Sequence, residues 1–302
     1  MKKKLKENMK NKLILIVFLI LNLSIYAEEE IDNKQKEKKS NQIYLRRNNG
    51  YVAPNELNIY NCIFPFALAY ELPSIQYNTF GFIKFLGDSK FSIEGNFYEY
   101  KKTNSTFERI NPNSGFYSKG NLGTFYRSEQ NLFLNYHFIE NRIILNVGFQ
   151  RLQSDLSDGS YGYYNYNFSQ NFKGIGVGFL LESPRFYGFY ISSGYRYSVL
   201  NGISNIDYSI VSSGRRAETL DIQDNPATKY FLREIKVVLG YELNDSIVLS
   251  FGFIDQFANV KLNRSNIIAS DLYYNLLVRS AIEANARSEY SGSTFASITY
   301  KF

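Results

Sequence analysis

The 302-residue chain has very little of the side-chain chemistry on which metal and redox sites depend. It contains one cysteine, one histidine, two methionines and no tryptophan. A single cysteine cannot form a disulfide within the chain, and one cysteine with one histidine cannot provide the ligands of a structural zinc site. We therefore expect no disulfide framework, no bound metal and no cofactor.

The excess of positive charge is small, and it lies at the N-terminus. The chain has 34 Lys and Arg against 28 Asp and Glu, a formal net charge of +6. Residues 1–27 hold six lysines and one glutamate, whereas residues 50–302 hold 22 bases and 22 acids. Because a phosphate-binding surface needs clustered positive charge, the sequence predicts no nucleic-acid partner.

Residues 1–27 have the order of a secretory signal peptide. Lysines precede an apolar run from Leu13 to Leu23, which is shorter than the about 20 residues that a bilayer-spanning helix needs. Ala27 is the predicted cleavage site, and a short N-terminal anchor helix is the alternative. Residues 28–50 are rich in both charges and poor in apolar groups, which predicts a solvated, disordered segment in the periplasm.

Beyond residue 75, apolar residues recur at every second position in runs that end at polar turns, which is typical of β-strands. The glycines of residues 174–178 follow this alternation with Ile175 and Val177. They lack the third glycine and the following helix of a phosphate-binding loop. We therefore interpret them as a stripe of glycines that faces the interior of a barrel.

Two features favour a barrel that spans a membrane over a soluble sandwich. The apolar set is heavy in Phe and Tyr, as on a lipid face, while the other set is mostly Gly, Ser and Asn, as in a hydrated interior. Connections also alternate between tight and long, as periplasmic turns and outer loops do. The tight connections are 87–90, 140–142, 182–185 and 244–245, and the long ones are 101–120, 154–162, 198–228 and 263–290.

The predicted fold is therefore all-β: a transmembrane, antiparallel, up-and-down β-barrel of about ten strands, spanning residues 51–302. Tight turns define four hairpins, residues 293–302 form the last strand, and Leu57–Tyr70 is the candidate for the first. That segment contains Pro65 and alternates poorly, so a plug or a short helix is its alternative. Barrels of eight or twelve strands remain alternatives.

The last strand resembles the C-terminal assembly signal of bacterial outer-membrane barrel proteins. Phe302 is the final residue, and Tyr300 and Ile298 precede it on the same face. Together with the signal peptide, this resemblance implies export to the periplasm, recognition by the barrel assembly machinery, insertion into the outer membrane and contact with its lipid. It indicates a superfamily and no particular activity.

Several polar side chains are predicted to point into the barrel. They would either line an ion path or form a mutually neutralising network that fills the interior, and at ten strands we favour the filled interior. The predicted lumen-lining residues are Glu94, Asn135, His137, Arg196, Glu234 and Lys236.

The long outer connections are the predicted recognition elements, because exposed loops carry much of protein recognition. The connection 201–228 is the longest polar one. Nearby tyrosines would either bind sugars or form an aromatic girdle at the membrane edge, and we favour the girdle. The surface candidates are Tyr161, Tyr163, Tyr164, Tyr166, Arg215 and Arg216.

His137 is the one candidate for imidazole catalysis, and its setting argues against an enzyme. Outer-membrane lipases resemble one another in a His-x-Ser pair, but Ile139 occupies the serine position here. Ten-stranded outer-membrane proteases have a histidine at the outer rim, whereas His137 lies near a predicted periplasmic turn.

The leading hypothesis is a non-enzymatic outer-membrane barrel that serves surface interaction or envelope integrity. Its loops would contact a host, a phage, lipopolysaccharide or another surface partner. A small passive channel for ions or small solutes is the second hypothesis, and an outer-membrane hydrolase is the third. The sequence does not decide the oligomeric state.

Overall fold

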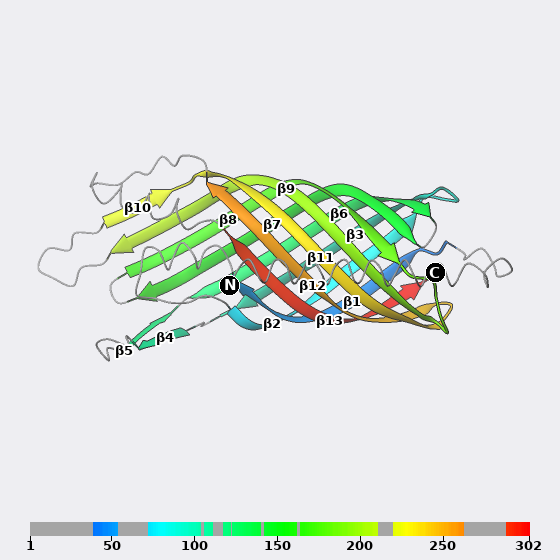
Figure 1. Cartoon of the computed structure of the whole chain (residues 1–302). Helices are drawn as coiled ribbons and strands as arrows, with labels where there is room; N and C mark the ends of the chain where they lie inside the picture. Colours follow the sequence, from blue (N-terminus) through cyan, green and yellow to red (C-terminus); the bar gives the residue numbers. More distant parts are fainter. Residues whose placement is uncertain are drawn as a thin grey trace, which may run out of the picture.

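A computed structural model shows that the chain forms a single closed β-barrel (Figure 1). The structure describes residues 39–53, 72–103, 106–110, 117–121, 123–139, 142–161, 164–210, 220–262 and 288–302. All regular elements in these ranges are β-strands. The described residues contain no helix that is long and apolar enough to span a membrane.

Ten strands form the wall of the barrel, and three short strands lie at one end of it. The wall consists of β1 (Gln42–Ala53), β2 (Leu72–Phe85), β3 (Phe91–Lys102), β6 (Thr124–Ile139), β7 (Ile143–Tyr161), β8 (Tyr164–Glu182), β9 (Phe189–Ile210), β11 (Ala227–Asn244), β12 (Ile247–Leu262) and β13 (Glu289–Lys301). The short strands are β4 (Thr106–Ile110), β5 (Tyr117–Asn121) and β10 (Leu220–Asp224). The predicted fold class and strand number are confirmed.

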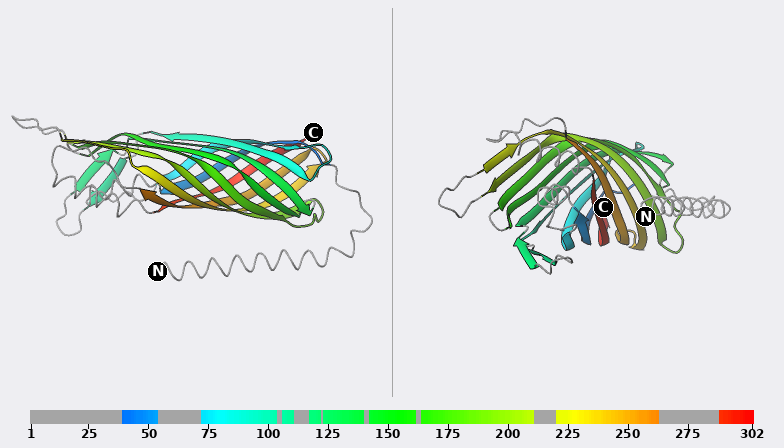
Figure 2. Two further views of the ribbon diagram at one scale, coloured as in Figure 1. Left: turned by 90° about the horizontal axis from the view of Figure 1, so that it is seen from above. Right: turned by 60° about the vertical axis from the view of Figure 1, so that its left-hand side comes forward.

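Pairing between the first and last strands closes the barrel. β1 is antiparallel to β13 from Gln42, opposite Lys301, to Ala53, opposite Tyr290. A row of paired residues that begins at Lys261 on β12 returns to that strand at Leu249 after one circuit, twelve residues away. This stagger requires strands that tilt strongly against the barrel axis, as Figure 2 shows.

The half of the wall nearest the tight turns has the pattern of a membrane barrel. On β7, Leu145, Val147 and Phe149 point outward and are 46, 47 and 48% exposed. Similar exposed apolar side chains occur on the other wall strands, so together they form an apolar band around the barrel. The next outward residue of β7 is Arg151, where the band ends.

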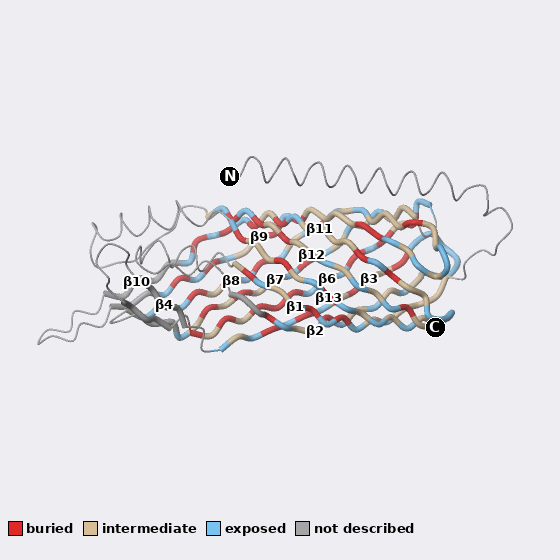
Figure 3. The backbone as a smooth tube through the Cα atoms, turned by 60° about the horizontal axis from the view of Figure 1, so that its bottom comes forward, coloured by how far each residue is buried: buried red, intermediate tan, exposed pale blue. Residues whose placement is uncertain are grey.

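Beyond the apolar band, the pattern reverses and the wall has the pattern of a soluble barrel. Further along β7, Leu152 and Leu156 point inward and are fully buried, while Gln153 and Asp155 lie outward. Figure 3 shows this alternation of buried and exposed residues along the strands. The barrel therefore continues past the lipid band as a water-exposed shell with an apolar core.

The predicted first strand was wrong. β1 begins at Gln42, within the segment expected to be disordered, and it pairs along its length with both β2 and β13. Leu57–Tyr70 lies outside the described residues, as do residues 1–38 with the predicted signal peptide. The inward side chains of β1 include Arg46 and Asn48. Because these inward residues are polar, the sequence of the strand has the composition of a solvated spacer.

Two predicted loops are largely strand. β7 continues to Tyr161, and β8 begins at Tyr164. Most of the expected connection 154–162 is therefore part of a β-hairpin. β9 continues to Ile210 and pairs there with β10, which takes most of the expected loop 198–228. These stretches were assigned to loops because they lie outside the lipid band, where outward positions are polar.

Candidate functional site in the barrel interior

An apolar layer fills the barrel on the side of the long connections. Its residues come from five neighbouring strands, and every one of them is at most 4% exposed. The rings of Phe172 and Tyr230 stack within it with centroids 5.0 Å apart. Because close-packed side chains exclude water, this layer makes the interior apolar along these five strands. It consists of Leu152, Phe172, Leu200, Tyr230, Leu232, Ala258 and Val260.

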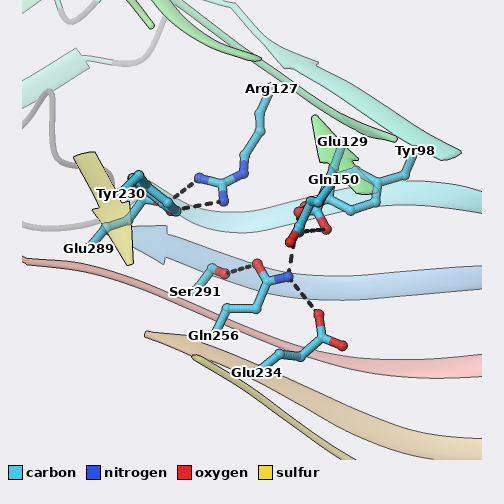
Figure 4. Close-up of polar contacts among 9 residues, drawn as sticks. All are labelled: Tyr98, Arg127, Glu129, Gln150, Tyr230, Glu234, Gln256, Glu289 and Ser291. Carbon is cyan, nitrogen blue, oxygen red and sulfur yellow. Dashed lines mark hydrogen bonds and ion pairs between the residues drawn. The ribbon is translucent and has the colours of Figure 1, made fainter. Parts of the chain in front are cut away.

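A buried ion pair crosses the lumen beside this layer. Arg127 on β6 donates to the carboxylate of Glu289 on β13, and the two side chains are 1 and 3% exposed. The hydroxyl of Tyr230 on β11 donates to the same carboxylate over 2.5 Å (Figure 4). The three strands are not neighbours in the wall, so these contacts hold opposite sides of the barrel together.

Glu129, which is 1% exposed, is the centre of a second polar cluster in the barrel interior (Figure 4). Its carboxylate accepts hydrogen bonds from Tyr98 over 2.6 Å, Gln150 over 2.7 Å and Asn131 over 2.9 Å. Gln256 lies 3.5 Å from it and donates over 2.9 Å to Glu234. A buried carboxylate with several donors is well compensated, so this cluster stabilises the charge of Glu129 inside the barrel.

The four predicted inward charges all face the interior. Arg196 lies 3.4 Å from the carboxylate of Glu234, and its guanidinium stacks 3.8 Å from the ring centroid of Phe133. Glu94 accepts from the hydroxyl of Tyr44 over 3.3 Å. Glu94, Arg196, Glu234 and Lys236 line two small cavities, of about 60 and 160 Å³.

The larger cavity opens towards the tight turns and contains His137 and Asn135. His137 Nε2 is 2.9 Å from the hydroxyl oxygen of Ser92, and Asn135 donates to the same hydroxyl over 3.5 Å. His137 is 5% exposed, and its ring lies against Phe85. All six predicted lumen-lining residues therefore face the interior, within the described part of the chain.

Four further charged residues are buried in the interior and were not predicted to lie there: Arg46, Arg127, Glu129 and Glu289. Arg46 lay in the segment assigned to a spacer, and Glu289 in the connection 263–290. Arg127 and Glu129 lie between the predicted connections 101–120 and 140–142, in a strand whose inward charges the sequence pattern did not indicate. Their regular spacing with Asn131 was the signal that could have found them.

The described ranges contain no cluster of three or more potential metal ligands among His, Cys, Asp and Glu. Tyr161 ends β7, while Tyr164 and Tyr166 lie on β8, and their side chains are not described. Tyr163, Arg215 and Arg216 lie outside the described residues.

The residues of the predicted assembly signal lie on the lipid-facing side of β13. Ile298, Tyr300 and Phe302 are 49, 48 and 64% exposed. The backbone N–H of Phe302 donates to the carbonyl of Asn41 over 2.9 Å. The C-terminus therefore lies at the seam where β13 meets β1.

A family model described as "Predicted outer membrane protein, Leptospiraceae" matches residues 37–302. The chain belongs to this family. The predicted resemblance to outer-membrane barrel proteins and the predicted outer-membrane localisation are thereby confirmed. No curated protein matches the chain.

Solved structures with a similar arrangement include three of outer-membrane or surface proteins. The outer membrane protease OmpT of Escherichia coli is 12% identical, with a TM-score of 0.49, over 90% of this chain and 99% of that one. Neisserial surface protein A is 9% identical, with a TM-score of 0.31, over 87 and 98% of the two chains. The toluene transporter TodX of Pseudomonas putida is 8% identical, with a TM-score of 0.36, over 87 and 89%.

Proposed function

We propose that this outer-membrane protein is a non-enzymatic barrel with a closed lumen, whose end with the long connections contacts partners outside the cell. The observation that carries this proposal is the filled interior. An apolar layer, a buried ion pair and the Glu129 cluster follow one another along the barrel. A barrel filled in this way transmits no solute but holds its outer end rigidly.

The long strands support a role at the surface. β7, β8 and β9 have 19, 19 and 22 residues, more than the 9–11 that a membrane-spanning strand needs. Their outer parts, together with β4, β5 and β10, form a platform beyond the apolar band (Figure 1). Such a scaffold positions recognition loops without flexibility at their bases.

Planar-bilayer conductance tests the closed lumen. We expect no single-channel steps from the refolded protein, because the apolar layer blocks the path. Regular steps would restore the passive-channel hypothesis, for which the two cavities, of about 60 and 160 Å³, are too small.

A shortened connection tests the surface role. Ile203 on β9 pairs with Ala227 on β11, so a two-residue turn between these positions removes β10 and the outer end of β9 while the barrel is kept. We expect this variant to fold. Cells that carry it should bind surface partners less than cells that carry the wild-type protein. Unchanged binding in every surface assay would contradict the proposal.

A second candidate function rests on the contact between Ser92 and His137. A serine hydroxyl 2.9 Å from an imidazole nitrogen has the spacing of a nucleophile and its base. The same contact is also how a buried histidine obtains a hydrogen-bond partner. Reaction with a fluorophosphonate probe distinguishes the two: labelling that Ser92→Ala abolishes would support a hydrolase, and we expect no labelling.

A further inference from the structure

A row of positive charges crosses the outside of the barrel on five neighbouring strands, β7, β8, β9, β11 and β12. Four of its five positions are basic, and all four basic side chains are exposed. The row is one continuous line of paired residues: Arg151, Lys173, Asn201, Lys229 and Lys261. We call its four cations the basic row.

The basic row contains two like-charged pairs. Arg151 lies directly opposite Lys173, and Lys229 lies directly opposite Lys261. Such pairs have Cβ atoms about 5 Å apart, and like charges directly opposite one another destabilise a sheet. In the described part of the chain none of the four cations forms an ion pair with a carboxylate, although Lys261 Nζ lies over the ring of Phe231, 5.4 Å from its centroid. No carboxylate in the described part of the chain therefore neutralises the electrostatic repulsion within the two pairs, and an external anion would reduce it.

The basic row lies at the edge of the apolar band. Two residues nearer the tight turns on the same strands, Phe149, Ile175 and Val199 point outward and are 48, 63 and 36% exposed. Because the strands tilt, the row starts at this edge on β7 and rises away from the band towards β12. Arg151 and Lys173 therefore face the headgroup region of the leaflet on the side of the long connections, and Lys229 and Lys261 lie further from the apolar band.

The opposite wall does not repeat this arrangement. On β1, Arg47 donates to Asn78 over 3.1 Å and to Gln76 over 2.8 Å, so protein groups satisfy its guanidinium. On β3, Glu99 accepts from the hydroxyl of Tyr126 over 3.3 Å. Directly opposed pairs of cations therefore occur on the side of the basic row, whereas the cations described on β1–β3 are not paired with one another across strands.

We propose that the basic row binds the phosphorylated headgroups of lipids in the outer leaflet. Phosphate oxygens would bridge the like-charged pairs, since charge-assisted hydrogen bonds to phosphate are strong. The acyl chains of the same lipids would lie against Phe149 and Ile175. The site is on the wall of the barrel, so it is independent of the surface role proposed for the long connections.

Native mass spectrometry of the refolded protein in detergent tests the proposal, with phosphatidic acid as the probe. We compare wild type with the variant R151Q/K173Q/K229Q/K261Q. Each cation near an anionic lipid contributes roughly a fivefold factor to binding, so we expect at least a tenfold loss of affinity. The charge control is R47Q/K84Q/K90Q/K101Q, which removes the same amount of charge from β1, β2, the turn 87–90 and β3 and should change affinity less than twofold.

Inorganic phosphate distinguishes a lipid site from a simple anion site. We expect about 10 mM phosphate to displace little phosphatidic acid, because free phosphate has no acyl chains to bury. Full displacement would overturn the assignment to lipid. Equal losses in the two variants would show a general charge effect and would also overturn the proposal, as would unchanged binding in the basic-row variant. Circular dichroism verifies that both variants are folded.

Discussion

The buried ion pair between Arg127 and Glu289 yields the sharpest test of how the interior is held together. The pair crosses the lumen, and the hydroxyl of Tyr230 donates to the same carboxylate. Replacing one partner leaves the other as an uncompensated charge in the apolar part of the barrel. Replacing both removes the desolvation cost together with the attraction.

The expected magnitudes differ strongly between single and double variants. Arg127→Met and Glu289→Gln should each lower the free energy of unfolding by about 3–5 kcal/mol, the usual cost of breaking a buried pair. The double variant should lie within about 2 kcal/mol of wild type, because it leaves no uncompensated charge in the apolar part of the barrel. The coupling energy between the two positions should therefore exceed about 3 kcal/mol.

Equilibrium unfolding in urea is measured in detergent for all four proteins of this double-mutant cycle. The unfolding is monitored by the far-ultraviolet circular dichroism of the β-sheet. Arg47→Met is the matched control, since its guanidinium bonds to neutral side chains on the outer surface. It should change stability by less than about 0.5 kcal/mol. Additive effects of the two single substitutions would refute the claim that the pair acts as one unit across the lumen.

Two further substitutions test the packing and the seam. A Cβ at Gly176 would lie 2.4 Å from Ser198 Oγ and 3.3 Å from the ring of Phe133, so Gly176→Val should cost about 1–3 kcal/mol in the same unfolding assay. Ile175→Val, on the lipid face beside it, should be nearly neutral, and equal costs would contradict the inward assignment. Deleting Phe302 removes the backbone bond to Asn41 and the terminal aromatic residue. We expect less protein in the outer membrane of cells but little change in refolding yield in detergent, and a matching loss in both would indicate a stability effect alone.

The sequence was sufficient for the parts of the wall that touch lipid. There, outward positions such as Leu145 and Phe149 must be apolar, and this requirement leaves a clear period of two. The tight turns followed from the same pattern, and so did the inward direction of Glu234 and Lys236. The strand number came out right because the barrel needs an even number of strands with both ends on one side, although the first strand was misplaced.

The strand ends that were assigned to loops have one physical cause, which is the change of environment along each strand. Next to lipid, apolar residues face outward, whereas beyond the band residues such as Leu152 and Phe172 face inward around a dry core. At the crossover neither face is consistently apolar, so the periodicity weakens although the strand continues. The outer ends of β7, β8 and β9 were assigned to loops for this reason.

The same crossover explains why the interior site could be predicted only in part. A polar residue in an alternating strand is read as lumen-facing when lipid defines the other face, which holds for Glu94 and Arg196. Near the crossover, Arg127 and Glu289 are inward charges in an apolar surrounding. Only the attraction to a partner across the barrel offsets the free-energy cost of burying each of them. Local periodicity carries no information about that partner, because the two residues are 162 positions apart in the chain. Interior ion pairs of this kind follow from the closed register of the barrel, which fixes which strands face each other.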